Sequence, residues 1–209
     1  MAAFFSNLRN TVIAGVVIAL IVFIIHFEMQ GGSLGPVFWL DLTRLLHVIA
    51  GVMWIGLLWY FNFVATPTMP QIPAELRPAL GKYITPAALF WFRWAAMATI
   101  ILGLLLAQLN GYMLQALTLD GYDPAGSFTD EKSLIIGIGM WFGIIMWFNV
   151  WFVIWPNQQK ALNIADRYPN LSADDKAASA KTAGMFSRIN TMLSIPMLFC
   201  MVGATHLFA

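Results

Sequence analysis

The stretch Leu134–Trp155, LIIGIGMWFGIIMWFNVWFVIW, decides the fold class of this protein. It contains no charged residue, and Asn149 is its only amide side chain. A helix needs about 20 apolar residues to cross the ~30 Å hydrocarbon core of a bilayer, so this stretch is long enough to span a membrane. Its apolar residues do not alternate with polar ones, as they would in a strand of a membrane β-barrel.

Four further stretches have a similar length and character: residues 11–27, 40–64, 88–109 and 183–207. Hydrophobic residues make up 60% of the 209 and charged residues 10%, whereas a soluble protein carries about 25% charged residues. The net charge of +1 lacks the basic excess of a nucleic-acid-binding protein. We therefore expect an all-α integral membrane protein. Its five transmembrane helices would form one bundle in contact with membrane lipid, and residues 1–209 a single domain.

The basic residues are distributed unevenly between the two sides of this predicted bundle. All 11 lysines and arginines except Arg44 and Lys132 fall on the side that also carries the N-terminus. Because the cytoplasmic side of a membrane protein is enriched in Lys and Arg, we expect the N-terminus to lie inside and the C-terminus outside.

Two loop segments carry signals for where helices stop and start. The segment after the second span contains prolines at positions 67, 70, 73 and 78. Because proline breaks helices, we expect no continuous helix there, only a short surface helix near residues 74–83. The sequence Ser172-Ala173-Asp174-Asp175 is similar to a capping box, so the last helix is expected to begin near Ala173, ahead of its membrane span.

The three histidines become informative once the spans are oriented. His26 falls at the outer end of the first span, His47 about 10 Å below the outer boundary of the second, and His206 near the outer end of the last. Histidine in a membrane helix is rare and usually functional, and two imidazoles on facing helices are a known ligand pair for haem iron. Other interpretations are an interfacial anchor for His26, a structural or proton-handling role for His47, and a metal site made by all three histidines.

The neighbours of His47 favour haem ligation. Gly51, one turn along the same helix face, leaves space for a flat macrocycle, and Trp54 follows on that face. Arg44, one turn toward the outer surface, is placed to pair with a haem propionate, unless Asp41 neutralises it. The ligands that we expect for the iron of haem b are His47, then His206 as its partner and His26 as the fallback.

A second polar layer is expected toward the inner side, from residues 62, 93, 149, 188 and 190. Converging arginine and asparagine side chains suit a planar oxyanion, so Arg93, Asn62 and Asn149 are candidate catalytic residues at a substrate site. Alternatively, the arginine extends to the membrane interface and the asparagines hydrogen-bond neighbouring helices.

Four sequence motifs resemble those of one known family. They are LHVIAGVMWIG at Leu46–Gly56, YFNFV at Tyr60–Val64, WFRW at Trp91–Trp94 and NVWFVIWPNQQK at Asn149–Lys160. Together they resemble the membrane domain of the bacterial cytochrome-c-coupled urate hydroxylases, the urate oxidase N-terminal family, over about residues 40–161. The first motif alone is also similar to segments of haem-b protoporphyrinogen oxidases and of copper-resistance membrane proteins.

The resemblance implies a multi-pass protein of the bacterial inner membrane that oxidises urate to 5-hydroxyisourate and passes the electrons to a fused cytochrome c. This chain is shorter than that family's usual membrane domain. With Cys200 as its only cysteine, it has no CxxCH motif for covalent haem. We therefore expect a partner, either a cytochrome c or another subunit of a membrane complex, to take up the electrons. The residues that match the family motifs are His47, Trp54, Asn62, Arg93, Asn149 and Asn157.

The leading hypothesis from the sequence is a haem-b-binding membrane oxidoreductase related to urate hydroxylases. It would transfer electrons between a small substrate or partner and a cytochrome. Two alternatives stay open at this point. One is a non-catalytic transmembrane subunit of a larger respiratory or photosynthetic complex, and the other is a protoporphyrinogen-oxidase-like membrane enzyme.

Overall fold

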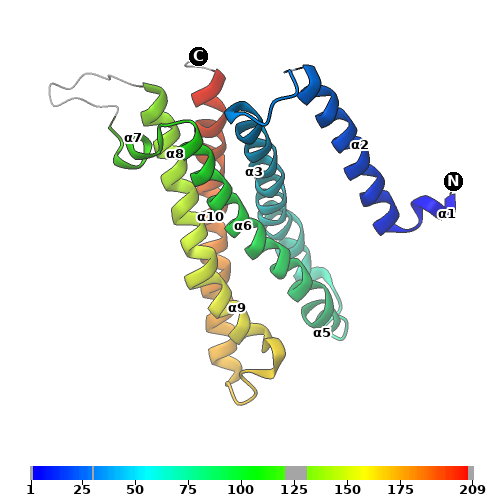
Figure 1. The fold of residues 1–209 in the computed structure, drawn as a ribbon. Coiled ribbons are helices and arrows are strands. Elements are labelled where there is room, and N and C mark those ends of the chain that lie inside the picture. Colours follow the sequence, from blue (N-terminus) through cyan, green and yellow to red (C-terminus); the bar gives the residue numbers. More distant parts are fainter. Residues whose placement is uncertain (1, 30, 121–130, 207–209) are drawn as a thin grey trace. The chain divides into compact units, whose positions relative to one another are not determined.

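The computed structural model describes residues 2–29, 31–120 and 131–206 (Figure 1). All regular secondary structure in these ranges is helical, which confirms the all-α prediction. Five helical stretches are long and apolar enough to cross a membrane: Leu8–Met29, Pro36–Gln71, Arg77–Leu109, Glu131–Leu162 and Ala173–Ala204. The first four predicted spans lie inside the corresponding stretches. The fifth begins inside its stretch, and its last residue, Leu207, lies outside the described residues.

The five stretches contain α-helical, π-helical and 3₁₀ segments. The first is α2 (Leu8–Met29), preceded by the short α1 (Ala2–Phe5). The second is made of α3 (Pro36–Trp59), η1 (Tyr60–Ala65), α4 (Thr66–Thr68) and η2 (Met69–Gln71). The third is made of α5 (Arg77–Ala79), η3 (Leu80–Ile84) and α6 (Thr85–Leu109), and the short α7 (Met113–Thr118) follows it. The fourth is made of α8 (Glu131–Phe148), η4 (Asn149–Ile154) and α9 (Trp155–Leu162), followed by η5 (Ile164–Asp166). The fifth is α10 (Ala173–His206).

Proline positions explain the π-helical segments. Among the described residues, η1, η3 and η4 each end two residues before a proline, at Pro67, Pro86 and Pro156. A proline has no N–H to donate, and its ring crowds the carbonyl four residues back. A π turn, with hydrogen bonds from i to i+5, changes the bonding register by one residue at that point. We infer that the wider turn accommodates each proline ring without ending the helix.

The predicted break in the proline-rich segment is confirmed, but it is shorter than expected. The helix continues past Pro67 and Pro70 to Gln71, and only residues 72–76 are non-helical. The short surface helix expected near residues 74–83 is also not a separate element. Helix begins at Arg77 and runs without a break into the third candidate span.

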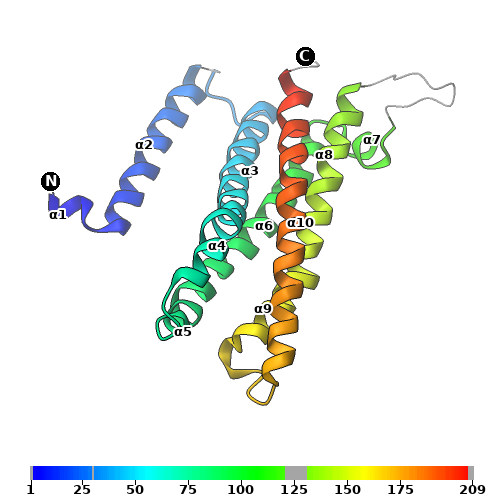
Figure 2. The ribbon, with the colours of Figure 1, turned by 180° about the vertical axis from the view of Figure 1, so that it is seen from behind.

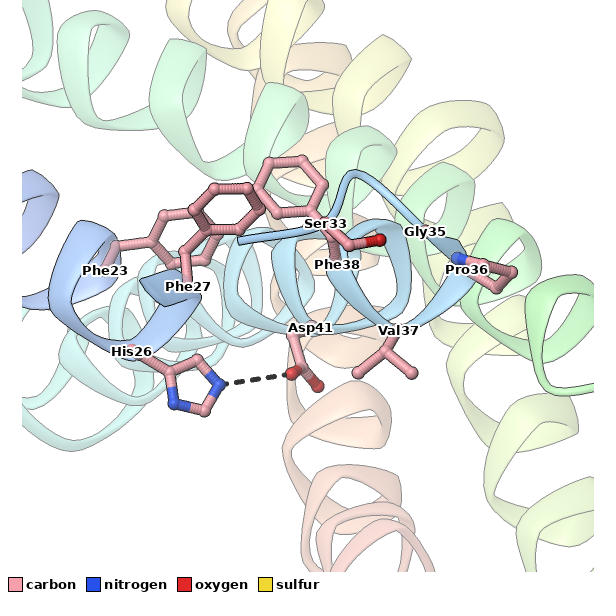
Figure 3. A pocket seen from close by; sticks show the side chains of 9 residues that line it. All are labelled: Phe23, His26, Phe27, Ser33, Gly35, Pro36, Val37, Phe38 and Asp41. Carbon is pink, nitrogen blue, oxygen red and sulfur yellow. Dashed lines mark hydrogen bonds and ion pairs between the residues drawn. The ribbon is translucent and has the colours of Figure 1, made fainter. Parts of the chain in front are cut away.

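The chain divides into two compact units, residues 1–42 and 43–209. The first unit contains α1, α2 and the first residues of α3, and no residue of α2 is buried. Phe38 at the start of α3 packs edge-on against Phe23 and Phe27, with ring centroids 5.5 and 5.3 Å apart. Nε2 of His26 lies 3.4 Å from Oδ2 of Asp41 (Figure 3). The ring contacts and the His26–Asp41 pair together join the end of α2 to the start of α3.

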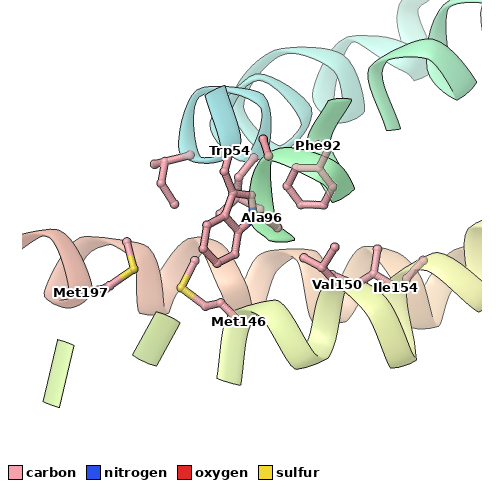
Figure 4. Packing of buried hydrophobic residues seen from close by; sticks show 11 residues of the cluster. Trp54, Phe92, Ala96, Met146, Val150, Ile154 and Met197 are labelled. Carbon is pink, nitrogen blue, oxygen red and sulfur yellow. The ribbon is translucent and has the colours of Figure 1, made fainter. Parts of the chain in front are cut away.

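The second unit is a helical bundle in which α8 and α10 lie side by side, as both views show (Figures 1 and 2). Its core combines aromatic and aliphatic side chains from the second, third, fourth and fifth stretches. Figure 4 shows Trp54, Phe92, Ala96, Met146, Val150, Ile154 and Met197 packed against one another.

A line of polar side chains on α10 binds two other stretches of the second unit. Ser187 accepts a hydrogen bond from Nδ2 of Asn62 at 2.8 Å, and Ser194 accepts one from Nε1 of Trp59 at 2.9 Å. Between them, Oδ1 of Asn190 accepts one from Nδ2 of Asn149 at 2.9 Å. Interhelical hydrogen bonds of this kind hold membrane helices together, because lipid tails are as apolar as the helix surfaces.

Glycines let α8 approach its neighbours closely. A Cβ on Gly139 would lie 2.8 Å from Cβ of Cys200 on α10. A Cβ on Gly137 would overlap the backbone carbonyl oxygen of Ala116 on α7. Real Cβ atoms do not approach other heavy atoms so closely, so these two positions require glycine.

The start of α10 confirms the capping prediction. The backbone N–H of Asp175 donates to Oγ of Ser172 at 3.1 Å, and the Ser172 hydroxyl donates to Oδ2 of Asp175 at 2.6 Å. The helix begins at Ala173, as expected. An N-cap serine satisfies one of the N–H groups that the first turn of a helix leaves without a partner.

Gly139→Ala is expected to lower the thermal unfolding temperature of the detergent-purified protein, because overpacking a tight contact costs about 1–3 kcal/mol. Gly184→Ala on α10 is the matched control, since a Cβ there meets no atom within 4 Å. The control is expected to be unchanged or slightly more stable, because alanine is a better helix former than glycine. Equal unfolding temperatures for the two variants would contradict the close α8–α10 contact.

Candidate cofactor site

Helices α3, α6, α8 and α10 of the second unit surround a cavity of about 730 Å³. Small-molecule and cofactor sites commonly occupy about 300–1,000 Å³. Most of the wall is apolar and includes Met140, Met197 and Met201. The polar side chains on the wall, apart from two indoles, are Arg44, His47, Thr99, Asn110, Tyr112, Lys132 and His206.

His47 has a defined orientation in this cavity. Its Nδ1 lies 2.9 Å from the backbone carbonyl oxygen of Thr99 on α6. A carbonyl oxygen only accepts hydrogen bonds, so Nδ1 carries the proton and Nε2 of the neutral ring is left as an acceptor or metal ligand. Metal-binding histidines are commonly fixed by such a bond from the other ring nitrogen.

Gly103 provides the space that the His47 ring occupies. A Cβ at position 103 would lie 2.8 Å from Cε1 and 3.2 Å from Nδ1 of the imidazole. Gly103 and Thr99 are four residues apart, and therefore on one face of α6. Neither residue was among the predicted site residues. Together they seat the ring, Thr99 through its carbonyl oxygen and Gly103 through the absence of a side chain.

Two cations line the same cavity. They are Arg44 on α3 and Lys132 on α8, the two basic residues that are predicted to lie on the outer side. Tyr112, which follows α6, also lines the cavity. Burial raises the pKa of the Tyr112 phenol, and the charge of Arg44 opposes this effect. The phenol is therefore protonated at neutral pH and is available as a hydrogen-bond donor.

The structure brings together five of the six residues predicted to bind a cofactor. Those on the wall of the cavity are Arg44, His47, Gly51, Trp54 and His206. Trp54 is fully buried, and its Nε1 has no hydrogen-bond partner. The sixth residue, His26, belongs to the first unit and lies at a smaller pocket of about 210 Å³, where it is paired with Asp41 (Figure 3).

The predicted inner polar residues are arranged differently from a converging substrate site. The amide nitrogens of Asn62 and Asn149 donate to Ser187 and Asn190 on α10. Arg93 instead lies against an indole, with its Cζ 3.2 Å from the centroid of the Trp155 ring. In the described part of the chain no hydrogen bond joins the arginine to either asparagine. The two asparagines thus hydrogen-bond a neighbouring helix, which was the alternative to a role at a substrate site.

Comparison with known proteins gives no relative for this site. No protein-family model, no curated protein and no solved structure matches the chain. The resemblance to urate hydroxylases therefore stays a prediction from the sequence. Within the described ranges no group of three or more His, Cys, Asp or Glu side chains is placed to hold a metal ion. The alternative of a metal site made by all three histidines is therefore wrong.

The tautomer of His47 is directly measurable. In a His26→Gln, His206→Gln double variant, His47 is the only histidine, and ¹⁵N NMR of the metal-free protein is expected to show a protonated Nδ1 and an unprotonated Nε2. Adding Gly103→Ala is expected to displace the ring and mix the tautomers. Gly56→Ala on α3 is the control, because a Cβ there meets nothing within 4 Å. A ring protonated mainly on Nε2 would contradict the hydrogen bond to Thr99.

Proposed function

We propose that the second unit binds haem b and acts as a membrane redox protein, with Nε2 of His47 as an axial ligand of the iron. The observation that carries this proposal is the 2.9 Å hydrogen bond between Nδ1 of His47 and the carbonyl of Thr99. That bond fixes the tautomer that leaves Nε2 for a metal, inside a cavity lined mainly by apolar side chains.

The shape and charge of the cavity suit this group. Its volume of about 730 Å³ and its apolar wall are appropriate for a large, flat and mostly apolar cofactor. Arg44 and Lys132 supply two positive charges on that wall, and a haem has two propionates for them to bind. The protonated phenol of Tyr112 adds a hydrogen-bond donor near the same charges.

His206 is the proposed second ligand. It lies on α10 and lines the same cavity as His47 on α3, so ligation by both would join these helices through the iron. A haem held by two histidines supplies one-electron transfer and has no open position for O₂. His26, the fallback ligand, is engaged with Asp41 in the first unit.

Electron transfer requires a donor and an acceptor. We propose a small substrate or a partner protein as the donor, with urate suggested by the sequence resemblance, and a cytochrome c as the acceptor. The distribution of basic residues supports an N-terminus on the inner side of the membrane, and the sequence resemblance suggests a bacterial inner membrane. In that orientation the cavity wall with Arg44 and Lys132 would lie toward the outer side, where a soluble cytochrome c can approach.

Optical spectroscopy of the purified protein tests the proposal. After reduction with dithionite, the wild type is expected to show the sharp α band of a six-coordinate haem b, because both axial positions hold histidine. His47→Ala is expected to lose the bound haem, and His206→Ala to convert it to a five-coordinate spectrum. His26→Ala is the matched control and is expected to keep the wild-type bands. A wild-type protein that takes up no haem, even when haem is added, would overturn the proposal.

Haem titration of the cofactor-free protein tests whether Arg44 and Lys132 bind the propionates. Arg44→Gln and Lys132→Gln are each expected to weaken haem binding about tenfold. Hydrogen bonds to charged groups contribute about 1.5–3 kcal/mol, and about 1.4 kcal/mol corresponds to tenfold in affinity. Lys181→Gln is the control, because Lys181 is exposed and does not line the cavity. Equal affinities for all three variants would show that the cations do not bind the propionates.

A further inference from the structure

Arg93 places a positive charge inside the second unit, and within the described ranges no acidic side chain forms an ion pair with it. It lies on α6, about 7 Å past the predicted start of the span at Ala88, and its residue is only 9% exposed. Its Nε and Nη1 atoms are completely buried and have no hydrogen-bond partner. Buried charged groups are normally paired, because leaving them unpaired costs free energy. The position of Arg93 therefore calls for an acceptor from outside the chain.

The surroundings of the Arg93 guanidinium are aromatic. Its Cζ lies 3.2 Å from the ring centroid of Trp155 and 5.9 Å from that of Trp151. A cation–π contact of this kind stabilises the charge in part but satisfies none of its N–H groups. The indole Nε1 atoms of Trp151 and of Trp147, one turn earlier, are also buried without an acceptor. The unpaired donors at this position thus include Nε and Nη1 of Arg93 and Nε1 of Trp151.

The guanidinium can be reached from the surface of the bundle. Its third nitrogen, Nη2, is not among the completely buried atoms. The neighbouring surface is strongly apolar, since Phe90, Trp91 and Trp94 on α6 and Phe152 on η4 are about half exposed or more. In a membrane such a surface contacts acyl chains, and tryptophans in particular collect at the level of lipid headgroups.

We propose that Arg93 binds the phosphate of an acidic phospholipid whose acyl chains lie on this aromatic surface. A phosphate oxygen accepts hydrogen bonds and carries a negative charge, so it would pair with the Arg93 guanidinium through the N–H groups of Nη2, the nitrogen that is not completely buried. A carboxylate of a partner subunit would also supply charge. The apolar surface around Arg93 favours the lipid, because it matches acyl chains without any further polar contact. This site is independent of the proposed haem.

Native mass spectrometry with lipid titration tests the site. The wild-type protein, in a non-ionic detergent, is titrated with phosphatidylglycerol and with phosphatidylcholine. It is expected to bind phosphatidylglycerol about tenfold more tightly, the size of effect typical of a charged hydrogen bond. Arg93→Gln is expected to lose this preference. Arg188→Gln is the matched control, because Arg188 is also on the predicted inner side but is exposed, and it is expected to keep the preference.

If Arg93→Gln does not fold, Arg93→Lys serves in its place. A lysine keeps the charge but not the planar guanidinium that stacks on Trp155, so the preference is expected to fall severalfold. Thermal unfolding gives an independent measure, since phosphatidylglycerol should stabilise the wild type more than phosphatidylcholine does. Equal affinity of the wild type for the two lipids would overturn the proposal. A preference that survives in the Arg93 variants would overturn it as well.

Discussion

The hydrogen bonds of Asn190 are the interaction on which the second unit depends. Helices in a bilayer gain little from burying apolar surface against each other, because lipid is equally apolar. Asn190 is fully buried, accepts from Asn149 at 2.9 Å and donates to the carbonyl of Met146 at 2.9 Å. Ser187 and Ser194 extend this contact along α10 to the second stretch. The close glycine contacts between α8 and α10 are possible because these polar groups fix which faces meet.

The cavity follows from how α3 is attached to the bundle. Near its C-terminal end, α3 is held to α10 by the hydrogen bond from Trp59 to Ser194. Further toward its N-terminal end, His47 holds it to Thr99 on α6. The residues of α3 between these two contacts line the cavity, including Gly51 and Trp54. The hydrogen bond from His47 to Thr99 thus has two roles. It attaches α3 to α6, and it sets the tautomer that leaves Nε2 of His47 for the proposed haem iron.

The sequence predicted those features that depend on one helix or on composition. The five spans and the start of α10 at its serine cap came from hydropathy and local capping chemistry. The grouping of Arg44, His47, Gly51 and Trp54 came from helical spacing alone. Thr99 could not be found in this way, because it acts through a backbone carbonyl, and every residue has one. The roles of the asparagines were also undetermined, since an amide in a span suits a helix contact and a substrate site equally well.

The most direct test of the account is an experimental structure of the purified protein in detergent or nanodiscs. A planar ligand is expected in the cavity, with its metal bound to Nε2 of His47. The hydrogen bond from Nδ1 to Thr99 should be retained, and Arg44 and Lys132 should contact the ligand's carboxylates. A cavity filled by lipid acyl chains, with Nε2 of His47 bound to no metal, would contradict the central claim.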